Sequence, residues 1–151
     1  MYKHTHTGAY EIAIHNGKIL LVKKQRGPYK GKWDLPGGGI EMGENSIDVL
    51  NREFGEECGY SIEKTKLVDV INSRVEYVNE ENKFEELTLI SIVYIVSLKQ
   101  YEIINSETII RGTEDISDSK WIDIDKVKSI PHTSVINAIL KGENLRESDG
   151  L

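Results

Sequence analysis

The sequence predicts an α/β domain, and three features of the chain lead to this prediction. Strand-like segments come first, one amphipathic helix follows, and two long β-rich segments lie beyond it. The chain has 151 residues, of which 38% are hydrophobic and 29% charged, which is enough apolar material for one core. We therefore expect residues 1–151 to form a single domain with its core at about 8–141.

The first two strands are predicted to form a hairpin. Ala9–His15 and Lys18–Lys24 are rich in apolar residues, and Asn16-Gly17 between them tolerates the positive φ angles of a tight turn. The polar segment before them, which contains His4 and His6, is expected to be a mobile tail.

The segment Asn45–Cys58 is predicted to be a helix with defined ends. Asn45 is a good N-cap, and Gly59 can end the helix. Apolar side chains recur at steps of three and four residues, so one face should be buried; they are Ile47, Leu50, Phe54 and Cys58.

The C-terminal half is predicted to add more strands and a closing helix. Leu67–Val78 and Phe84–Leu98 should pair as an antiparallel hairpin. Apolar residues on both faces of the second strand favour a layer of helix on each side. Lys120–Ile122 is a candidate short strand, and His132–Lys141 is a predicted helix that ends at Gly142.

Charge and cysteine content exclude some classes of partner. The net charge of −6 argues against a nucleic-acid duplex or an anionic membrane recognised through bulk charge. The single cysteine, Cys58, cannot form an internal disulfide, which fits a reducing compartment. The apolar stretch Leu87–Leu98 is too short to span a membrane. We therefore expect a cytoplasmic protein, either a monomer or a homodimer.

Three carboxylates on the predicted helix indicate a cation site. Glu53, Glu56 and Glu57 stand at positions i, i+3 and i+4, on the face away from Ile47 and Phe54. Like charges at this spacing cost roughly 0.2–0.5 kcal/mol per pair on an isolated helix. A divalent cation removes that repulsion, and oxygen ligands favour Mg²⁺, with Mn²⁺ as a possible substitute, over Zn²⁺.

A glycine-rich loop and a basic loop lie before this helix. The segment Leu35–Gly39 allows the backbone to approach a metal or a phosphate closely. Arg26 and Lys32 are candidate substrate contacts, and Trp33 could either stack on a base or pack in the core. The same basic cluster contains Lys23, Lys24 and Lys30.

The spacing of these residues resembles a known motif. Gly38, five residues, Glu44, seven residues and then Arg52–Tyr60 resemble the full Nudix box, with every specified position filled. The preceding Trp33–Gly38 and the later Trp121, followed by 122–127, resemble further features of the family. The resemblance implies a Nudix-type α/β/α sandwich with a mixed β-sheet.

The resemblance also implies roles for the residues of the motif. Glu53, Glu56 and Glu57 would ligate the metal, together with the backbone around Gly38. The general base in this family is sometimes a glutamate of the motif and sometimes one from a distant loop.

Residues outside the metal set would have supporting roles. Glu44 and Arg52 would form an orienting pair that fixes the carboxylate face. Glu53 and Glu114 are both candidates for the general base, and Glu107 lies in the same segment as Glu114.

The implied function is that of a Mg²⁺-dependent pyrophosphohydrolase, a hydrolase of phosphoanhydride bonds. A nucleoside triphosphate is the first expectation for the substrate, with dinucleoside polyphosphates and nucleotide sugars as alternatives, because selectivity comes from loops outside the motif. A non-catalytic nucleotide sensor is another alternative. A prenyl diphosphate isomerase of the same fold would need a catalytic cysteine in the sheet region, whereas Cys58 lies in the motif helix.

Overall fold

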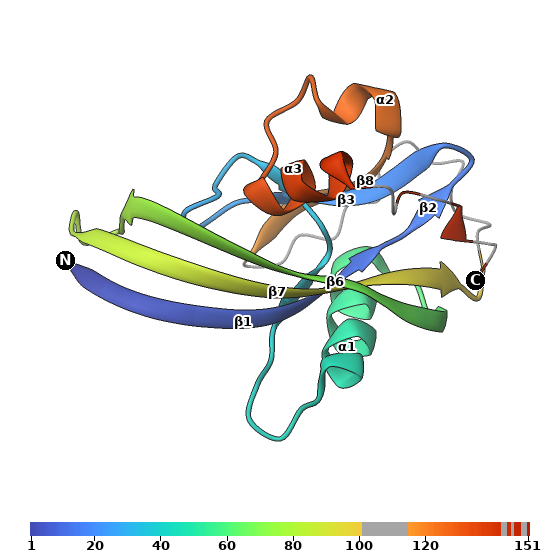
Figure 1. Cartoon of the computed structure of the whole chain (residues 1–151), viewed down its shortest axis with the longest axis horizontal. Coiled ribbons are helices and arrows are strands. Elements are labelled where there is room, and N and C mark those ends of the chain that lie inside the picture. Colours follow the sequence, from blue (N-terminus) through green and yellow to red (C-terminus); the bar gives the residue numbers. More distant parts are fainter. Residues whose placement is uncertain (101–114, 143–144, 146, 149–150) are drawn as a thin grey trace.

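The computed structural model describes residues 1–100, 115–142, 145, 147–148 and 151 (Figure 1). The chain forms two sheets and three helices in these residues. The elements are β1 (Tyr2–Ile12), β2 (Ile14–His15), β3 (Lys18–Lys24), β4 (Trp33–Asp34), β5 (Gly37–Gly39), α1 (Ser46–Cys58), β6 (Ile62–Val78), β7 (Phe84–Leu98), β8 (Ile116–Asp123), α2 (Ile124–Val127) and α3 (Ser134–Lys141).

The larger sheet has the strand order β5-β1-β7-β6 and is mixed. β1 runs parallel to β7, whereas β5 and β6 pair antiparallel with their neighbours. The predicted β6–β7 hairpin is confirmed, although β6 begins at Ile62 instead of Leu67. Its turn is held by Asn79, whose Oδ1 accepts the backbone N–H groups of Glu81 and Lys83. β6 lies at one end of the strand order and is largely exposed.

The smaller sheet has the order β2-β3-β4, and β8 also pairs with β3. The tight turn at Asn16-Gly17 is confirmed, with φ angles of 51° and 72°. The predicted strand Ala9–His15, however, is divided between the two sheets, since Ile12 ends β1 and Ile14 begins β2. β8 is longer than the predicted Lys120–Ile122.

The N-terminal segment is not a tail, contrary to the sequence-based expectation. β1 begins at Tyr2, and His4 and His6 lie within it, in register with Leu87 and Leu89 of β7. Backbone pairing with β7 therefore orders a polar segment whose side chains gave no sign of burial.

The helices lie on opposite sides of the larger sheet, α1 on one side and α3 on the other (Figure 1). α1 packs against β1 and β5, and α3 packs against β6. α3 begins at Ser134 instead of the predicted His132, because Thr133 is its N-cap and His132 bridges to Trp33. None of the helices in the described ranges is long and apolar enough to cross a membrane.

The prediction that both faces of β7 are covered is confirmed only in part. On the side of α3, Leu87, Leu89, Val93 and Ile95 are buried. On the other side, Ile90, Ile92 and Tyr94 are half-buried, because α1 covers only part of that face.

Candidate active site

The ends of α1 are fixed by local contacts. Asn45 caps the N-terminus: its Oδ1 accepts the N–H of Asp48 at 3.0 Å, and its own N–H donates to the Asp48 carboxylate at 3.1 Å. Gly59 ends the helix with a φ of 77° and donates its N–H to the carbonyls of Phe54 and Gly55. These are the ends predicted from the sequence.

The buried face of α1 differs from the prediction at one position. Leu50, Phe54 and Cys58 are buried as expected, but Ile47 is 38% exposed, and Val49 is fully buried in its place. The first turn therefore presents Val49 to the sheet, where it packs with Ala9.

The three glutamates of α1 differ strongly in exposure. Only Glu56 is on the solvent side, with 58% of its side chain exposed, whereas the side chain of Glu53 is 16% exposed. Glu57 is buried and accepts the backbone N–H of Gly37 at 2.8 Å. The expectation of one shared face turned away from the core is therefore wrong for Glu57, which lies between the helix and the sheet.

Burial changes the acidity of these carboxyl groups. It raises the pKa of Glu57 to about 8, and the nearby charges of Glu53 and Asp34 act in the same direction. Burial also raises the pKa of Glu53, while its hydrogen bond from Arg52 opposes the change. Without a cation, the ionised form of both carboxyl groups is therefore disfavoured.

The glycines of β5 bring the backbone directly against these carboxylates. Gly37 has a φ of 136°, and a Cβ there would lie 2.2 Å from the carbonyl oxygen of Ala9. A Cβ on Gly38 would lie 2.7 Å from Oε1 of Glu53. Only glycine therefore allows β5 to fit between β1 and α1 at this point.

Arg52 connects the loop before α1 to the carboxylates on it. Its Nε and Nη2 donate to the two carboxylate oxygens of Glu44, both at 2.8 Å, and its Nη1 donates to Oε1 of Glu53 at 2.7 Å. The hydrogen bonds from Arg52 hold the pKa of Glu44 below its usual value. A bidentate pair of this kind fixes the orientation of both side chains.

Three charged groups near these carboxylates come from outside the motif. Glu11 of β1 is fully buried, and neither carboxylate oxygen has a hydrogen-bond partner among the described residues. Burial raises the pKa of Asp34 as it does that of Glu57, and the positive charge of Lys24 opposes the rise in both. Asp34 itself accepts the hydroxyl of Thr133 at 2.8 Å.

Lys24 was predicted only as part of a basic cluster, and neither Glu11 nor Asp34 was predicted as a site residue from the sequence. The sequence did contain a sign that Glu11 is enclosed: it stands in an apolar strand with an alanine two residues before it and another two residues after it, Ala9 and Ala13. Small residues at i−2 and i+2 leave room for a helix to approach that side of a strand.

The other predicted site residues lie outside this carboxylate cluster or outside the described residues. Arg26 forms an ion pair with Asp115 at 2.6 Å. Lys32 is exposed, with its ammonium 6.0 Å from the centre of the Tyr29 ring. Trp33 is half-buried against the core, and its backbone N–H donates to Pro131. Glu107 and Glu114 lie outside the described residues.

The oxygen donors fit a hard divalent cation in kind, but they do not converge in this conformation. Across the described ranges, no three side chains of His, Cys, Asp or Glu are grouped closely enough to hold an ion. Arg52 engages Glu53, and the Gly37 N–H engages Glu57. Cation binding would therefore require at least one carboxylate to exchange its present partner.

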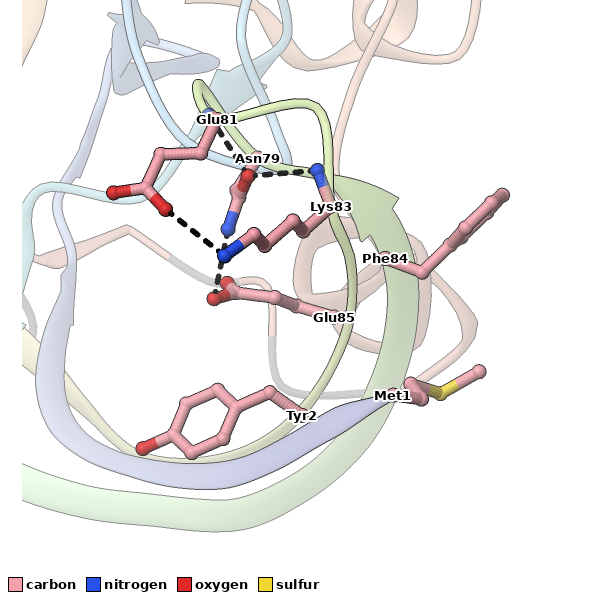
Figure 2. Close-up of a pocket in the computed structure, with 7 residues that line it drawn as sticks. All are labelled: Met1, Tyr2, Asn79, Glu81, Lys83, Phe84 and Glu85. Carbon is pink, nitrogen blue, oxygen red and sulfur yellow. Dashed lines mark hydrogen bonds and ion pairs between the residues drawn. The ribbon is translucent and has the colours of Figure 1, made fainter.

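The cavities at the tip of the β6–β7 hairpin lie away from the carboxylates. One of them has a volume of about 690 Å³. In Figure 2, Tyr2 lies across this pocket from the hydrogen-bonded turn residues Asn79 and Lys83, and Phe84 points outward. A second cavity of about 690 Å³ is bordered by Arg26, Lys30 and Tyr77, among others. Tyr2 is nine residues from Glu11 along β1, roughly 30 Å at about 3.3 Å per residue.

Comparison with known proteins agrees with the motif. A profile described as the NUDIX domain matches residues 4–141. An ADP-ribose pyrophosphatase of Methanocaldococcus jannaschii is 25% identical over 146 residues, which cover 95% of this chain and 78% of that protein. An oxidized purine nucleoside triphosphate hydrolase of Danio rerio is 29% identical over 116 residues, 77% of this chain and 65% of that protein. Nucleoside triphosphatase NudI of Enterobacter sp. (strain 638) is 45% identical over 56 residues, 36% of this chain and 40% of that protein.

Solved structures share the fold. A MutT NUDIX hydrolase from Burkholderia pseudomallei superimposes with a TM-score of 0.67 at 24% identity, covering 93% of this chain and 99% of that one. The NUDIX domain of Shewanella oneidensis NrtR, solved with ADP ribose, gives a TM-score of 0.59 at 17% identity, covering 93% and 86%. These likenesses confirm the predicted mixed sheet and fold class. Since the NUDIX profile spans residues 4–141 of 151, the chain belongs to the NUDIX family of hydrolases.

Proposed function

We propose that the chain is a Mg²⁺-dependent pyrophosphohydrolase of a nucleoside triphosphate. The observation that carries the proposal is Glu57, a carboxyl group buried against the Gly37 backbone with Glu53 beside it. Burial of carboxylates in one place is costly unless a positive charge compensates them. A divalent cation supplies that compensation, and the phosphate groups of a bound substrate would provide further oxygen ligands for it.

The proposed ligands of Mg²⁺ are Glu53, Glu56, Glu57 and the backbone of Gly38, and Mn²⁺ would be a substitute. When bound, the ion lowers the pKa of water and offsets charge on the phosphate groups. The graded exposure of the three glutamates fits this assignment, because Glu57 lies inside and Glu56 lies at the solvent.

Arg52 and Glu44 are proposed to hold the carboxylates in place. Arg52 donates to both Glu44 and Glu53, so removing the guanidinium would free two side chains at once. For the proton of the attacking water, Glu53 and Glu114 remain the two proposed acceptors. Glu114→Gln separates them: if Glu114 is the base, this variant should lower kcat and leave Mn²⁺ binding intact, whereas an unchanged kcat leaves Glu53, whose replacement should weaken Mn²⁺ binding as well because Glu53 is also a proposed ligand.

Positive charge near the site is proposed to hold the phosphate groups of the substrate. Lys24 interacts electrostatically with Glu57 and Asp34, which supports a role for its ammonium group near the proposed cation. Arg26, Lys32 and Trp33 stay proposed contacts for the rest of the nucleotide.

The choice of a nucleoside triphosphate is supported by the names of two relatives, a nucleoside triphosphatase and an oxidized purine nucleoside triphosphate hydrolase. A nucleotide sugar is the second candidate, because the relative that covers 95% of this chain is an ADP-ribose pyrophosphatase. Binding without cleavage, as in a nucleotide sensor, is the outcome that would contradict both.

The test measures release of phosphate or pyrophosphate from nucleoside triphosphates, dinucleoside polyphosphates and ADP-ribose, with Mg²⁺ and with Mn²⁺. We expect cleavage of a triphosphate and a loss of roughly a hundred- to a thousandfold or more in Glu57→Gln. Glu76→Gln, which removes the same charge from the exposed face of β6, is the matched control and should leave the rate unchanged. A folded protein that binds these compounds but cleaves none of them would refute the proposal.

A further inference from the structure

Glu11 points toward α1 from the buried C-terminal part of β1. Its neighbours Tyr10 and Ile12 pack in the core on the α3 side. Successive side chains of a strand alternate between faces, so Glu11 lies on the α1 side with Ala9 and Ala13. Those two alanines pack against α1, Ala9 near Leu50 and Ala13 near Phe54 and Cys58.

One peptide group joins Glu11 to Glu57. The N–H of Glu11 donates to the carbonyl of Pro36 at 3.0 Å, and the N–H of the next residue, Gly37, donates to Oε1 of Glu57 at 2.8 Å. Both residues are therefore held against the two sides of the Pro36–Gly37 peptide. This connection places the backbone of Glu11 beside the peptide that binds Glu57, and the charges of Glu57 and Glu53 act on the Glu11 carboxyl group.

The Glu11 carboxyl group has no compensation from the described residues. It is fully buried, and both oxygens lack a hydrogen-bond partner. Burial, followed by the charges of Glu57 and Glu53, holds the pKa of Glu11 well above its usual range. An apolar side chain would fill the same space without this cost, as the alanines on either side of it do.

A divalent cation would provide the missing partner. Mg²⁺ and Mn²⁺ take oxygen ligands, and several carboxylates around one site are stable only when a cation lies among them. Glu57 and Glu53 face the same region from α1, whereas Glu56 is at the solvent edge. Glu11 is the carboxylate that reaches this region from the sheet.

We propose that Glu11, which lies outside the Gly38–Tyr60 motif, is a further carboxylate ligand of the divalent cation held by Glu53 and Glu57. This inference rests on the proposed function, since it assumes that these two glutamates bind the ion.

The test is Mn²⁺ binding, measured from the paramagnetic resonance signal of free Mn²⁺ and from the rise in Tm that Mn²⁺ produces. Native protein is compared with Glu11→Gln, Glu57→Gln and Ser91→Ala. Ser91 is the matched control, because it is a buried polar residue of the same sheet that also lacks a partner among the described residues. It is placed with Leu89 and Val93 on the α3 side of β7.

We expect Glu11→Gln to weaken Mn²⁺ binding by about tenfold or more. It should also reduce the Mn²⁺-induced rise in Tm, while leaving the Tm in EDTA equal to or above that of the native chain. Ser91→Ala should bind Mn²⁺ like the native protein.

The contrary outcomes distinguish the two claims. Loss of Mn²⁺ binding in Glu57→Gln but not in Glu11→Gln would overturn the role of Glu11 and leave the cation site intact. Unchanged binding in both variants would overturn the cation site itself. If Glu11→Gln does not fold, the same titration with Glu11→Asp decides, because moving the carboxylate by one methylene should still weaken binding, and unchanged binding would refute the proposal.

Discussion

The two sides of β1 bury different chemistry, although they belong to the same strand. On the α3 side, Tyr10 and Ile12 join an apolar core with residues of β7 and α3. On the α1 side, Glu11 is buried between two alanines, and the charge of Glu57 on the helix acts on its carboxyl group. Burial of apolar area on the α3 side stabilises the fold, whereas desolvation of the carboxyl groups on the α1 side destabilises it.

The two faces of β1 therefore differ in role: one contributes mainly to stability, and the other carries residues of the candidate site. A side chain on the α3 side can be judged by the area it buries. A buried carboxyl group on the α1 side, such as that of Glu11, acts against the stability of the cation-free fold and would become favourable only when a cation binds. Variants on the two sides should therefore change different measurements.

The largest expected effect on stability comes from the α3 side. Ile12→Ala removes a fully buried side chain and should lower the free energy of unfolding by about 2–5 kcal/mol. The rate per folded molecule should be nearly unchanged. Urea unfolding and a rate assay at a temperature where the variant is folded measure both, with exposed Thr7→Ala of the same strand as the control. A stable variant with a large loss of kcat would contradict this division.

The buried carboxyl groups on the α1 side should make the stability of the metal-free protein depend on pH. The pKa of Glu57 is raised from 4.5 to about 8 in the folded state. Between these values the unfolded chain releases a proton that the folded chain keeps, so stability falls as the pH rises. Glu11 and Asp34, whose pKa values are also raised, act in the same direction.

We therefore expect the Tm in EDTA to decrease by several degrees from pH 5 to pH 8, and the decrease to be smaller in Glu57→Gln. Saturating Mg²⁺ should flatten the profile of the native chain. A Tm that rises over this interval in EDTA would show that the buried carboxyl groups are ionised and stabilised by other charges.

A smaller effect is expected from the contact that orients the carboxylates. Arg52→Ala should lower the rate by roughly 10- to 100-fold, because Glu44 and Glu53 lose a shared donor. Arg74→Ala, which removes an arginine from the exposed face of β6, should have almost no effect. Equal rates in the two variants would mean that Arg52 has no orienting role.

The smallest effect should come from the cap of α1. Asn45→Ala loses the hydrogen bond to Asp48 and should cost about 1 kcal/mol of stability, a decrease of roughly 2–4 °C in Tm. Asn51→Ala, in the middle of the same helix, is the control and should not lower the Tm. A loss of activity in Asn45→Ala without a change in Tm would place the cap in the chemistry instead.

Signals carried by neighbouring residues allowed the sequence to predict much of the fold. The cap at Asn45, the stop at Gly59 and the turn at Asn16-Gly17 all depend on residues close in the chain, and all are confirmed. Ile47 is an exception on α1, because Val49 packs against Ala9 in its place and leaves Ile47 38% exposed.

Features that depend on pairing between distant segments were missed. The first half of β1 is polar and becomes a strand through parallel pairing with β7. β8 extends to Ile116 because β3 continues beside it. Neither partnership has a local signature, since the hydrogen bonds join backbone groups that every residue carries.

The candidate site divides in the same way. The spacing of Glu53, Glu56 and Glu57 on one helix could be read directly, but their exposures could not, because β1 and β5 decide which of them is buried. Glu11 was overlooked since an acidic residue in a strand is usually placed on the solvent side. Only the approach of α1 to Ala9 and Ala13 shows that this position is enclosed.

The outer strand β6 has a consequence for the behaviour of the protein at high concentration. An exposed strand of 17 residues offers backbone groups to which another molecule could add a strand, and this is a route to aggregation. Its pairing with β7 shifts register between Leu67 and Asp69, which disrupts a flat edge. Charged side chains cover the neighbouring positions and disfavour such addition; they are Glu63, Lys64, Lys66 and Asp69. Replacing the two lysines by valine would enlarge the apolar surface of this edge beside the exposed Leu67, and with it the tendency to form intermolecular sheets.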